Sequence, residues 1–168
     1  NLLELEEVAT AWMVLALGGK LEAFSELVND KAKSHKGQSD SAKVIRDLLR
    51  EEAYQPRAGQ DVKIQNQITE EFIQDRYSIR CTPQILGPIR ETLSLVWSWL
   101  ETEINSTSDN PLIDDNGRLG MGGNFYGGYL CQAMDFTKIN LAHVADLVDR
   151  QVLMIVSEKF SRGLPANL

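Results

Sequence analysis

The chain has 168 residues, of which 43% are hydrophobic and 24% charged, values typical of a soluble globular protein with a real core. Acidic residues outnumber basic ones by 24 to 17, and the net charge of −7 argues against a nucleic-acid partner, because binding phosphates requires a basic surface. The longest apolar run, at residues 8–17, is too short to cross a bilayer, so we expect no membrane partner. No signal peptide opens the sequence, and we therefore expect a cytoplasmic protein.

Residue types that bind metals or act as nucleophiles are sparse. Cys81 and Cys131 lack the spacing of a zinc or redox motif, which favours two reduced thiols. His35 and His143 have no partners at metal-ligand spacing, so we expect no metal site. No Ser-His-Asp or Cys-His arrangement is recognisable either.

The first part of the chain predicts two helices separated by glycines. Apolar residues recur at intervals of three or four positions, as on one face of a helix: Leu2, Leu5, Val8, Ala9, Trp12, Leu15 and Ala16. Only Asn1 could cap this helix, which suggests that the sequence starts within a helix. Gly18 and Gly19 break or kink it, and a second short helix is expected from Lys20 to Val28.

A polar loop at Lys33 to Ser39 precedes the next predicted helix, which Ser39 or Asp40 could cap. Its expected buried face comprises Ala42, Ile45, Leu48 and Leu49. Residues 51–61 read as a loop, and residues 62–81 are polar and irregular for their length. A polar stretch of this kind within a compact protein is often functional.

Two long helices are predicted in the second half. Thr82 as a cap and Pro83 in the first turn begin a helix that extends to about Asn105, in which Trp97 and Trp99 face different surfaces. The next helix spans about Gly128 to Glu158, with this expected inner face: Leu130, Met134, Ile139 or Leu141, Val144 or Ala145, Val148, Val152 and Ile155. The predicted fold is all-α, a bundle of long helices joined by irregular loops.

The irregular segment between these helices, at 106–126, is rich in turn signals. Asn110 precedes Pro111, which disfavours helical backbone at Asn110, and residues 114–117 could close a small hairpin. The glycine-rich run at 122–128 lacks the lysine and the preceding strand of a phosphate loop, so we favour a close approach of backbone to another element.

Two polar loops, Gln74–Arg80 and Asn105–Gly128, could carry chemistry. Tyr77 and Arg80 are three residues apart, so a helical turn would direct both side chains to one side. The guanidinium of Arg80 presents a planar set of donors that suits a carboxylate. Spacing alone nevertheless favours structural roles, in which Arg80 pairs with Asp75 or Glu71 and Tyr77 fills a core.

Several motifs in the same order together resemble the aromatic amino acid ammonia-lyases and aminomutases, and phenylalanine ammonia-lyases most of all. The resemblance covers nearly the whole chain, and so many motifs in order make chance an untenable explanation. They are His35-Lys36-Gly37-Gln38, Gln74 to Gln84, Leu86-Gly87-Pro88, Glu103 to Ser106, Asp109 to Asp114, Gly122 to Phe125 with Gly127, and Gly163 to Leu168.

The resemblance implies that residues 1–168 are part of the central helical domain of a larger chain. Members of this family are mostly α-helical homotetramers that eliminate ammonia from an aromatic L-amino acid to give an arylacrylate. Their electrophile is a methylidene-imidazolone group made from an internal Ala-Ser-Gly, with no metal. This sequence contains no Ala-Ser-Gly, so the 168 residues alone are expected to be inactive.

The family's site residues carry over by position. Arg80 is expected to bind the substrate carboxylate, and Tyr77 to lie beside the electrophile and the reacting amine. Gln74 and Asn110 are expected to form hydrogen bonds around the prosthetic group and Tyr77. Phe125 is expected to pack near the aromatic ring of the substrate.

Phenylalanine or tyrosine is favoured as substrate, because histidine-specific members more often have proline at the position of Arg76 and histidine at that of Tyr126. A 2,3-aminomutase and a histidine ammonia-lyase remain alternatives. A helical assembly domain without chemistry is an alternative of another class. The Gly-Ser-Ser-x-Met-Pro signature of the fumarase and aspartase group is absent.

Overall fold

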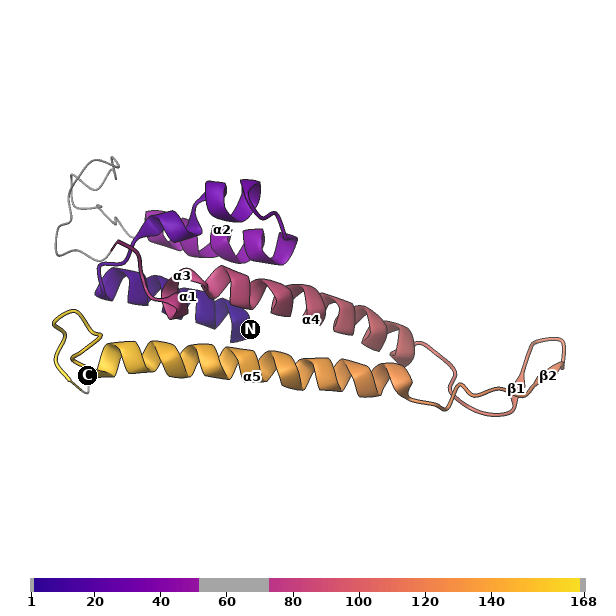
Figure 1. The fold of residues 1–168 in the computed structure, drawn as a ribbon. Coiled ribbons are helices and arrows are strands. Elements are labelled where there is room, and N and C mark those ends of the chain that lie inside the picture. The colour runs from indigo at the N-terminus through magenta and orange to yellow at the C-terminus, as the bar shows by residue number, and fades with distance from the viewer. Residues whose placement is uncertain (1, 52–72, 167–168) are drawn as a thin grey trace. The chain divides into compact units, whose positions relative to one another are not determined.

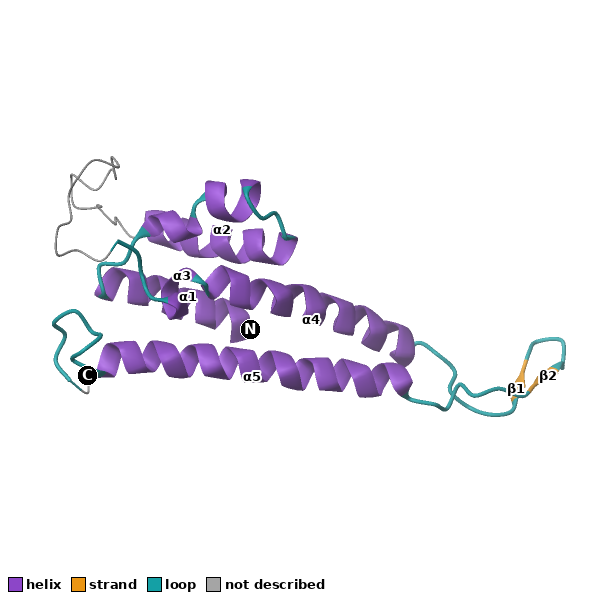
Figure 2. Cartoon of the chain, in the orientation of Figure 1, coloured by secondary structure: helices purple, strands orange, loops and turns teal. Residues whose placement is uncertain are grey.

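The computed structural model describes residues 2–51 and 73–166, and these residues form two compact units. The first unit comprises residues 1–90 and 143–168, and the second comprises residues 91–142. Apart from one short hairpin, the regular structure of the described residues is helical, which confirms the predicted all-α class (Figure 2). The loop predicted after Glu51 and the start of the polar stretch at 62–81 lie outside the described residues.

The first unit begins with α1 and α2, which pack against each other (Figure 1). The prediction of the first helix is confirmed, since α1 ends before Gly18, whose φ of 58° suits a residue without a Cβ. A 3-10 turn and a π-helical turn replace the single helix predicted at Lys20 to Val28. In chain order these elements are α1 (Leu2–Ala16), η1 (Leu21–Phe24), η2 (Leu27–Lys31), α2 (Lys36–Glu51) and α3 (Tyr77–Arg80).

The predicted caps of α2 are wrong, because Ser39 and Asp40 lie inside its first turns. The Ser39 amide donates to the carbonyl of His35 at 2.9 Å, a helical hydrogen bond that places the start of the helix earlier. The Ser39 hydroxyl donates instead to the Asn29 carbonyl, and Asp40 pairs with Lys36 one turn before it. The predicted buried face is confirmed, since Ala42, Ile45 and Leu49 are almost fully buried.

Two long helices, α4 (Thr82–Ile104) and α5 (Gly128–Val156), each contribute residues to both units. α4 begins at Thr82, followed by a proline whose missing N–H costs nothing in a first turn. The predicted cap is wrong, because Thr82 lies inside the helix and its hydroxyl donates to the Ser78 carbonyl. In the second unit the Trp99 ring contacts Tyr129 edge to face and Phe136 in a tilted arrangement, with ring centroids 5.5 and 6.0 Å apart. In the part of the chain that is described, no helix is apolar and long enough to span a membrane.

The turn predicted at 114–117 connects the two strands of a hairpin in the second unit. Asp114 accepts hydrogen bonds from the amides of Asn116 and Arg118, both at 2.9 Å, and from the Arg118 side chain at 2.7 Å. The hydrogen bonds from Arg118 are the main reason that the pKa of Asp114 is lowered. Gly117 has the positive φ of 75° that this turn requires. The paired strands are β1 (Leu112–Ile113) and β2 (Leu119–Gly120).

The predicted inner faces of α1 and α5 are largely wrong within the described residues, although Val144 of α5 is buried as predicted. Leu5 and Trp12 of α1 are 66% and 69% exposed, and Ile139 and Val152 of α5 are 54% and 52% exposed. The core of the first unit instead collects Ala11, Met13, Val14, Leu17, Phe24, Ile45, Leu49, Ile79 and Met154.

Two polar residues, Glu7 and Thr10, occupy the buried side of α1 because each finds a partner on another element. Glu7 is fully buried and accepts two hydrogen bonds from the guanidinium of Arg90, at 3.0 and 2.5 Å. Thr10 accepts a hydrogen bond from Gln151 at 2.9 Å. A buried charge or hydroxyl is tolerated when it is paired in this way, so apolar spacing alone identified the wrong face.

The helices α2 and α4 approach each other closely at Gly87. A Cβ at this position would lie 2.6 Å from the backbone nitrogen of Gln38 and 2.8 Å from its Cα. The side chains beside this contact are also connected, because Gln38 and Gln84 both donate to the buried Asn29, at 3.0 and 3.1 Å. The motifs at residues 35–38 and 86–88 therefore meet at one contact between α2 and α4.

Replacing Gly87 with alanine is expected to destabilise the protein by about 1–3 kcal/mol, because the added methyl group overlaps backbone atoms that cannot move away easily. In an open helix the same change would stabilise by up to about 1 kcal/mol. Urea unfolding monitored by circular dichroism measures the difference. Gly127→Ala, where nothing lies within 4 Å of the added Cβ, is the control. A Gly87→Ala protein as stable as the wild type would contradict the close approach.

Candidate functional site

A single helical turn, α3, presents the first group of predicted site residues. The amides of Ile79 and Arg80 donate to the carbonyl of Arg76, both at 3.0 Å, and the amide of Cys81 donates to Tyr77 at 2.8 Å. Ile79 is completely buried in the core, so its side chain anchors the turn to the core of the first unit. Side chains three residues apart then emerge on the same side, as the spacing of Tyr77 and Arg80 predicts.

Three predicted site residues meet at this turn: Gln74, Tyr77 and Arg80. Arg80 Nη1 donates to Gln74 Oε1, and the guanidinium carbon lies 4.7 Å from the centroid of the Tyr77 ring. The Tyr77 side chain is 72% exposed, so the stacked pair faces outward. Arg80 Nε is buried and has no hydrogen-bond partner among residues 2–51 and 73–166. A fixed guanidinium beside a phenol is the chemistry expected of a carboxylate-binding wall.

Two of the three purely structural roles considered for Tyr77 and Arg80 are excluded by the structure. Asp75 pairs with Arg162 and not with Arg80, at an Oδ1 to Nη2 distance of 2.7 Å. The exposure of Tyr77 excludes a role in filling the core of its unit. Glu71, the other partner considered for Arg80, lies outside the described residues.

The segment before the turn is fastened by Asp75, whose side chain is 1% exposed. Its Oδ2 accepts a hydrogen bond from the backbone amide of Lys20 at 2.6 Å, and its Oδ1 accepts from Arg162. Lys20 also donates through Nζ to the carbonyl of Ile73 at 3.1 Å. Gln74 is therefore held between two contacts with Lys20, which directly precedes η1.

A second set of hydrogen bonds supports the turn at Ser78. The carbonyl of Ser78 accepts from Gln151 Nε2 at 3.1 Å and from Thr82 Oγ1 at 3.3 Å. The hydroxyl of Ser78 donates to the sulfur of Met154 at 2.8 Å. Gln151 continues to Thr10, so α1, α4 and α5 all contribute to the floor beneath the turn.

A buried carboxylic acid, Glu6, lies at the edge of this floor. Burial raises the pKa of Glu6 from 4.5 to about 7, and the nearby charge of Glu7 acts in the same direction. Hydrogen bonding by Gln151 and Thr10 offsets only part of this rise. Its Oε1 atom is buried and unpaired within the described chain. The protonation of Glu6 therefore depends on pH near neutrality.

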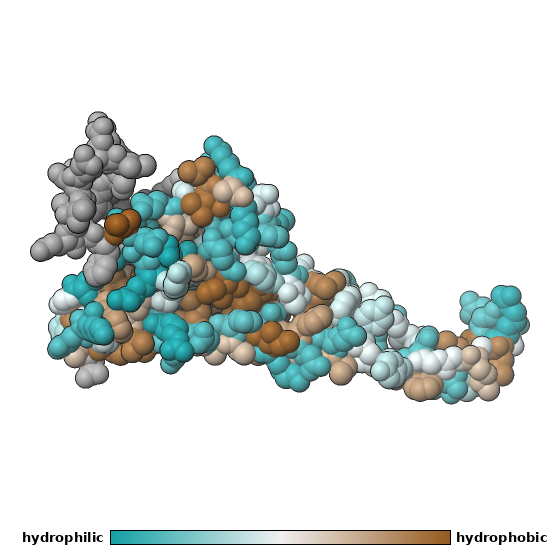
Figure 3. All heavy atoms as spheres, viewed as in Figure 1, coloured by the Kyte–Doolittle hydropathy of each residue, from teal (hydrophilic) through white to brown (hydrophobic). Residues whose placement is uncertain are grey.

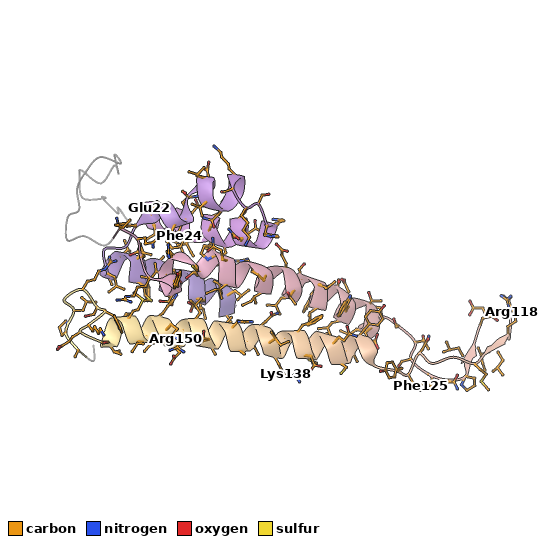
Figure 4. All side chains as sticks on the ribbon, viewed as in Figure 1. Glu22, Phe24, Arg118, Phe125, Lys138 and Arg150 are labelled. Carbon is orange, nitrogen blue, oxygen red and sulfur yellow. The ribbon has the colours of Figure 1, made fainter. Side chains whose placement is uncertain are left out.

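The remaining predicted site residues, Asn110 and Phe125, belong to the loop of the second unit. Asn110 Oδ1 accepts a hydrogen bond from the amide of Gly122 at 2.8 Å, which joins the two arms of the loop below the hairpin. Asn124 Nδ2 donates to the carbonyl of Thr107 at 3.4 Å and joins the two arms of the same loop nearer to α4 and α5 in the sequence. Phe125 is 67% exposed on the segment that leads into α5 (Figure 4).

The close backbone approach predicted for the glycine-rich part of this loop is not found. We expected the run at 122–128 to approach another element closely, but a Cβ at Gly123 or Gly127 would meet nothing within 4 Å in the described residues. The side chains around it are exposed and partly apolar, as Figure 3 shows for the hairpin region. The exposed apolar residues here are Ile113, Leu119, Met121, Phe125 and Tyr126.

Residues that could bind a metal are not gathered in the described ranges, where no three His, Cys, Asp or Glu side chains come together suitably. The two cysteines there are both free thiols. Sequence reasoning missed the parts that Arg162, Gln151 and Ser78 play beneath the turn. The contact of Gln151 with Ser78 spans 73 residues of the chain and that of Arg162 with Asp75 spans 87, so no local spacing could have identified them.

Replacing Glu6 with glutamine is expected to reduce the pH dependence of stability. The folded state retains the proton that the unfolded chain releases above pH 4.5, so stability falls as the pH rises from about 4.5 to about 7. Abolishing ionisation should shrink the change in the free energy of unfolding between pH 5 and pH 8 by about 1–3 kcal/mol. Glu22→Gln neutralises an exposed glutamate and is the control. Equal pH profiles of wild type and Glu6→Gln would contradict the assignment.

Comparison with known proteins adds independent information on the family. A family model described as "Aromatic amino acid lyase" matches residues 1–168. Histidine ammonia-lyase 2 of Fusobacterium nucleatum is 38% identical over 170 residues, covering 100% of this chain and 31% of that protein. The MIO-dependent tyrosine 2,3-aminomutase of Streptomyces globisporus is 34% identical, covering 96% of this chain and 32% of that protein.

Among solved structures, the tyrosine aminomutase from Streptomyces globisporus matches with a TM-score of 0.82 at 33% identity. The match covers 98% of this chain and 33% of the other. The chain thus spans about a third of the length of the curated relatives that it matches. From end to end of its 168 residues, this chain belongs to the aromatic amino acid lyase family.

Proposed function

We propose that these residues form part of an aromatic amino acid ammonia-lyase that converts L-phenylalanine or L-tyrosine into the corresponding arylacrylate and ammonia. The observation that carries the proposal is the group of Gln74, Tyr77 and Arg80 on one rigid turn. This turn rests on a buried floor and directs a guanidinium and a phenol to the outside. Membership of the family supports the reaction class.

Arg80 binds the substrate carboxylate in this proposal. Its side chain is oriented before substrate arrives, because Gln74 accepts one of its hydrogen bonds and the Tyr77 ring lies beneath it. An ion pair with a carboxylate in a closed site is worth more than one at an open surface, and its loss typically costs about 2–5 kcal/mol. A fixed carboxylate also fixes the orientation of the amine on the neighbouring carbon.

Tyr77 and Gln74 contribute hydrogen-bonding groups next to that carboxylate. The phenol of Tyr77 can donate or accept, and its three-residue spacing from Arg80 suits it to contact the reacting amine. Asn110 offers an amide that can form hydrogen bonds around the electrophile, and Phe125 offers an exposed ring that can pack on an aromatic substrate. We propose these roles on the residue types and on their positions in the family motifs.

The prosthetic group in this proposal is a methylidene-imidazolone formed from an Ala-Ser-Gly segment that the 168 residues do not contain. When present, it supplies an electrophile that captures the substrate amine. The residues described fit such a group, because Gln74 and Tyr77 present exposed amide and phenol groups that can form hydrogen bonds with it. One relative is named MIO-dependent, which supports the assignment.

We further propose that the complete protein is a cytoplasmic homotetramer that binds an aromatic amino acid as substrate, with neither nucleic acid nor membrane as a partner. The net charge of −7 supports the exclusion of nucleic acid. Apolar side chains such as Leu5 and Trp12 of α1 and Ile139 of α5 are exposed in the chain as described. Large apolar side chains exposed on both units are typical of surfaces that become buried in an assembly.

The complete protein, including the Ala-Ser-Gly segment that we expect in its flanking sequence, should release ammonia from phenylalanine or tyrosine. Growth of arylacrylate absorbance with phenylalanine, tyrosine and histidine in turn measures the preference. Chromatography for β-amino acids tests the aminomutase alternative. The 168-residue chain alone is the control and should produce no arylacrylate. A complete protein that acts on none of the three amino acids would favour a non-catalytic assembly role and refute the proposal.

Arg80→Ala in the complete protein is expected to lower kcat/KM by at least ~100-fold, equivalent to about 3 kcal/mol of transition-state stabilisation. Arg80→Lys should lose less, because it keeps the charge without the planar donor pair. Lys43→Ala removes a cation from an exposed pair on α2 and is the matched control. Wild-type kcat/KM in Arg80→Ala would refute the carboxylate-binding role.

A further inference from the structure

Asp75 is a buried carboxylate directly beside the proposed site, and it contacts no predicted site residue through its side chain. It accepts hydrogen bonds from the Lys20 amide at 2.6 Å and from Arg162 Nη2 at 2.7 Å. A Cβ at Gly19 would lie 3.2 Å from Asp75 Oδ2, so the chain after α1 is also close to this oxygen. A carboxylate this deeply buried costs several kcal/mol unless it is paired, so its partners determine where Asp75 lies.

Arg162 provides the pairing charge and connects two further points. Its Nη1 donates to the carbonyl of Leu17 at 2.7 Å and to that of Gly18 at 3.1 Å, while Nη2 reaches Asp75. Its backbone φ is 56°, in the left-handed region that non-glycine residues rarely adopt. Arg162 is therefore held in an uncommon conformation with its guanidinium between the end of α1 and the segment before α3.

The turn that carries Arg162 is itself fixed, and it contacts the same segment a second time. The amides of Phe160 and Ser161 donate to the carbonyl of Ser157, at 2.8 and 2.9 Å, and Ser161 is completely buried. The guanidinium carbon of Arg76 lies 4.3 Å from the centroid of the Phe160 ring. Two successive cation contacts, Arg162 to Asp75 and Arg76 to Phe160, thus join this turn to the residues that precede Tyr77.

These contacts act on the geometry of the proposed site through the backbone. The Arg76 carbonyl accepts the hydrogen bonds of the Ile79 and Arg80 amides, so a shift of residues 75 and 76 moves Tyr77 and Arg80 together. Gln74, which accepts from Arg80, is adjacent to Asp75. A displacement of about 1 Å in a group that orients substrate can cost roughly 100-fold in rate.

We propose that Arg162 is a positioning residue for the elimination reaction, acting through Asp75 to set the placement of Tyr77 and Arg80. The inference rests on the proposed function. It deepens that function by assigning to Arg162, in the turn after α5, a role in substrate alignment. Arg162 does not touch the substrate in this account, and its guanidinium is occupied by Asp75 and by the end of α1.

The test uses the complete protein with Arg162→Ala, Arg162→Lys, Asp75→Asn and the double variant Asp75→Asn/Arg162→Ala. Alanine and lysine both keep a Cβ, so the cost of the positive φ stays the same. Arg162→Ala should lower kcat/KM by roughly 10- to 100-fold, through a lower kcat together with a higher KM. Arg162→Lys should remain within about fivefold of wild type, since an ammonium can still pair with Asp75. The double variant should be no worse than the poorer single variant.

Hydrogen exchange provides a readout independent of activity. In Arg162→Ala the amides of residues 79–81 should exchange at least about tenfold faster than in wild type. Lys43→Ala, which breaks an exposed pair on α2, should change neither exchange nor kcat/KM.

An active wild type whose Arg162→Ala variant keeps full kcat/KM would overturn the positioning role, and so would lysine performing no better than alanine. An inactive wild type would overturn the proposed function instead, and unchanged exchange at residues 79–81 would then remove the structural basis of the positioning role as well.

Discussion

The buried carboxylate of Asp75 is the constraint on which the rest of the first unit depends. Leaving it unpaired away from water would cost several kcal/mol, so the fold must bring donors to it. Those donors come from the amide of Lys20 and from Arg162, which lie 55 residues before and 87 residues after it. One buried charge thus joins the end of α1, the segment before α3 and the turn after α5.

This constraint separates the two faces of the Gln74–Arg80 segment. Side chains that point inward, Asp75 and Ile79, are buried and fully used by the fold, whereas Gln74 and Tyr77 remain exposed. Ser78 lies between them and ties the turn to Gln151 and Met154. A short turn of four residues can therefore be rigid enough to orient a guanidinium, although an isolated turn of that length would not persist in water.

Sequence reasoning succeeded where local chemistry decides and failed where partners are distant. The start of α4 at Thr82, the break after α1 and the hairpin turn at 114–117 follow from proline, glycine and aspartate, whose preferences are local. The inner faces of α1 and α5 were wrong because Glu7 and Thr10 become acceptable in a core only through Arg90 and Gln151. For the same reason Tyr77 and Arg80 could be placed on one side of a turn, but the pairing of Asp75 with Arg162 could not be foreseen.

We propose that Arg80 binds the substrate carboxylate in an active site completed by other parts of the protein. A crystal structure of the complete protein with an arylacrylate bound tests this role. The ligand carboxylate is expected to lie within hydrogen-bonding distance, about 2.7–3.0 Å, of the Arg80 guanidinium, with the Tyr77 phenol beside it. A ligand whose carboxylate is bound by another cation, with Arg80 still engaged only by Gln74, would contradict it.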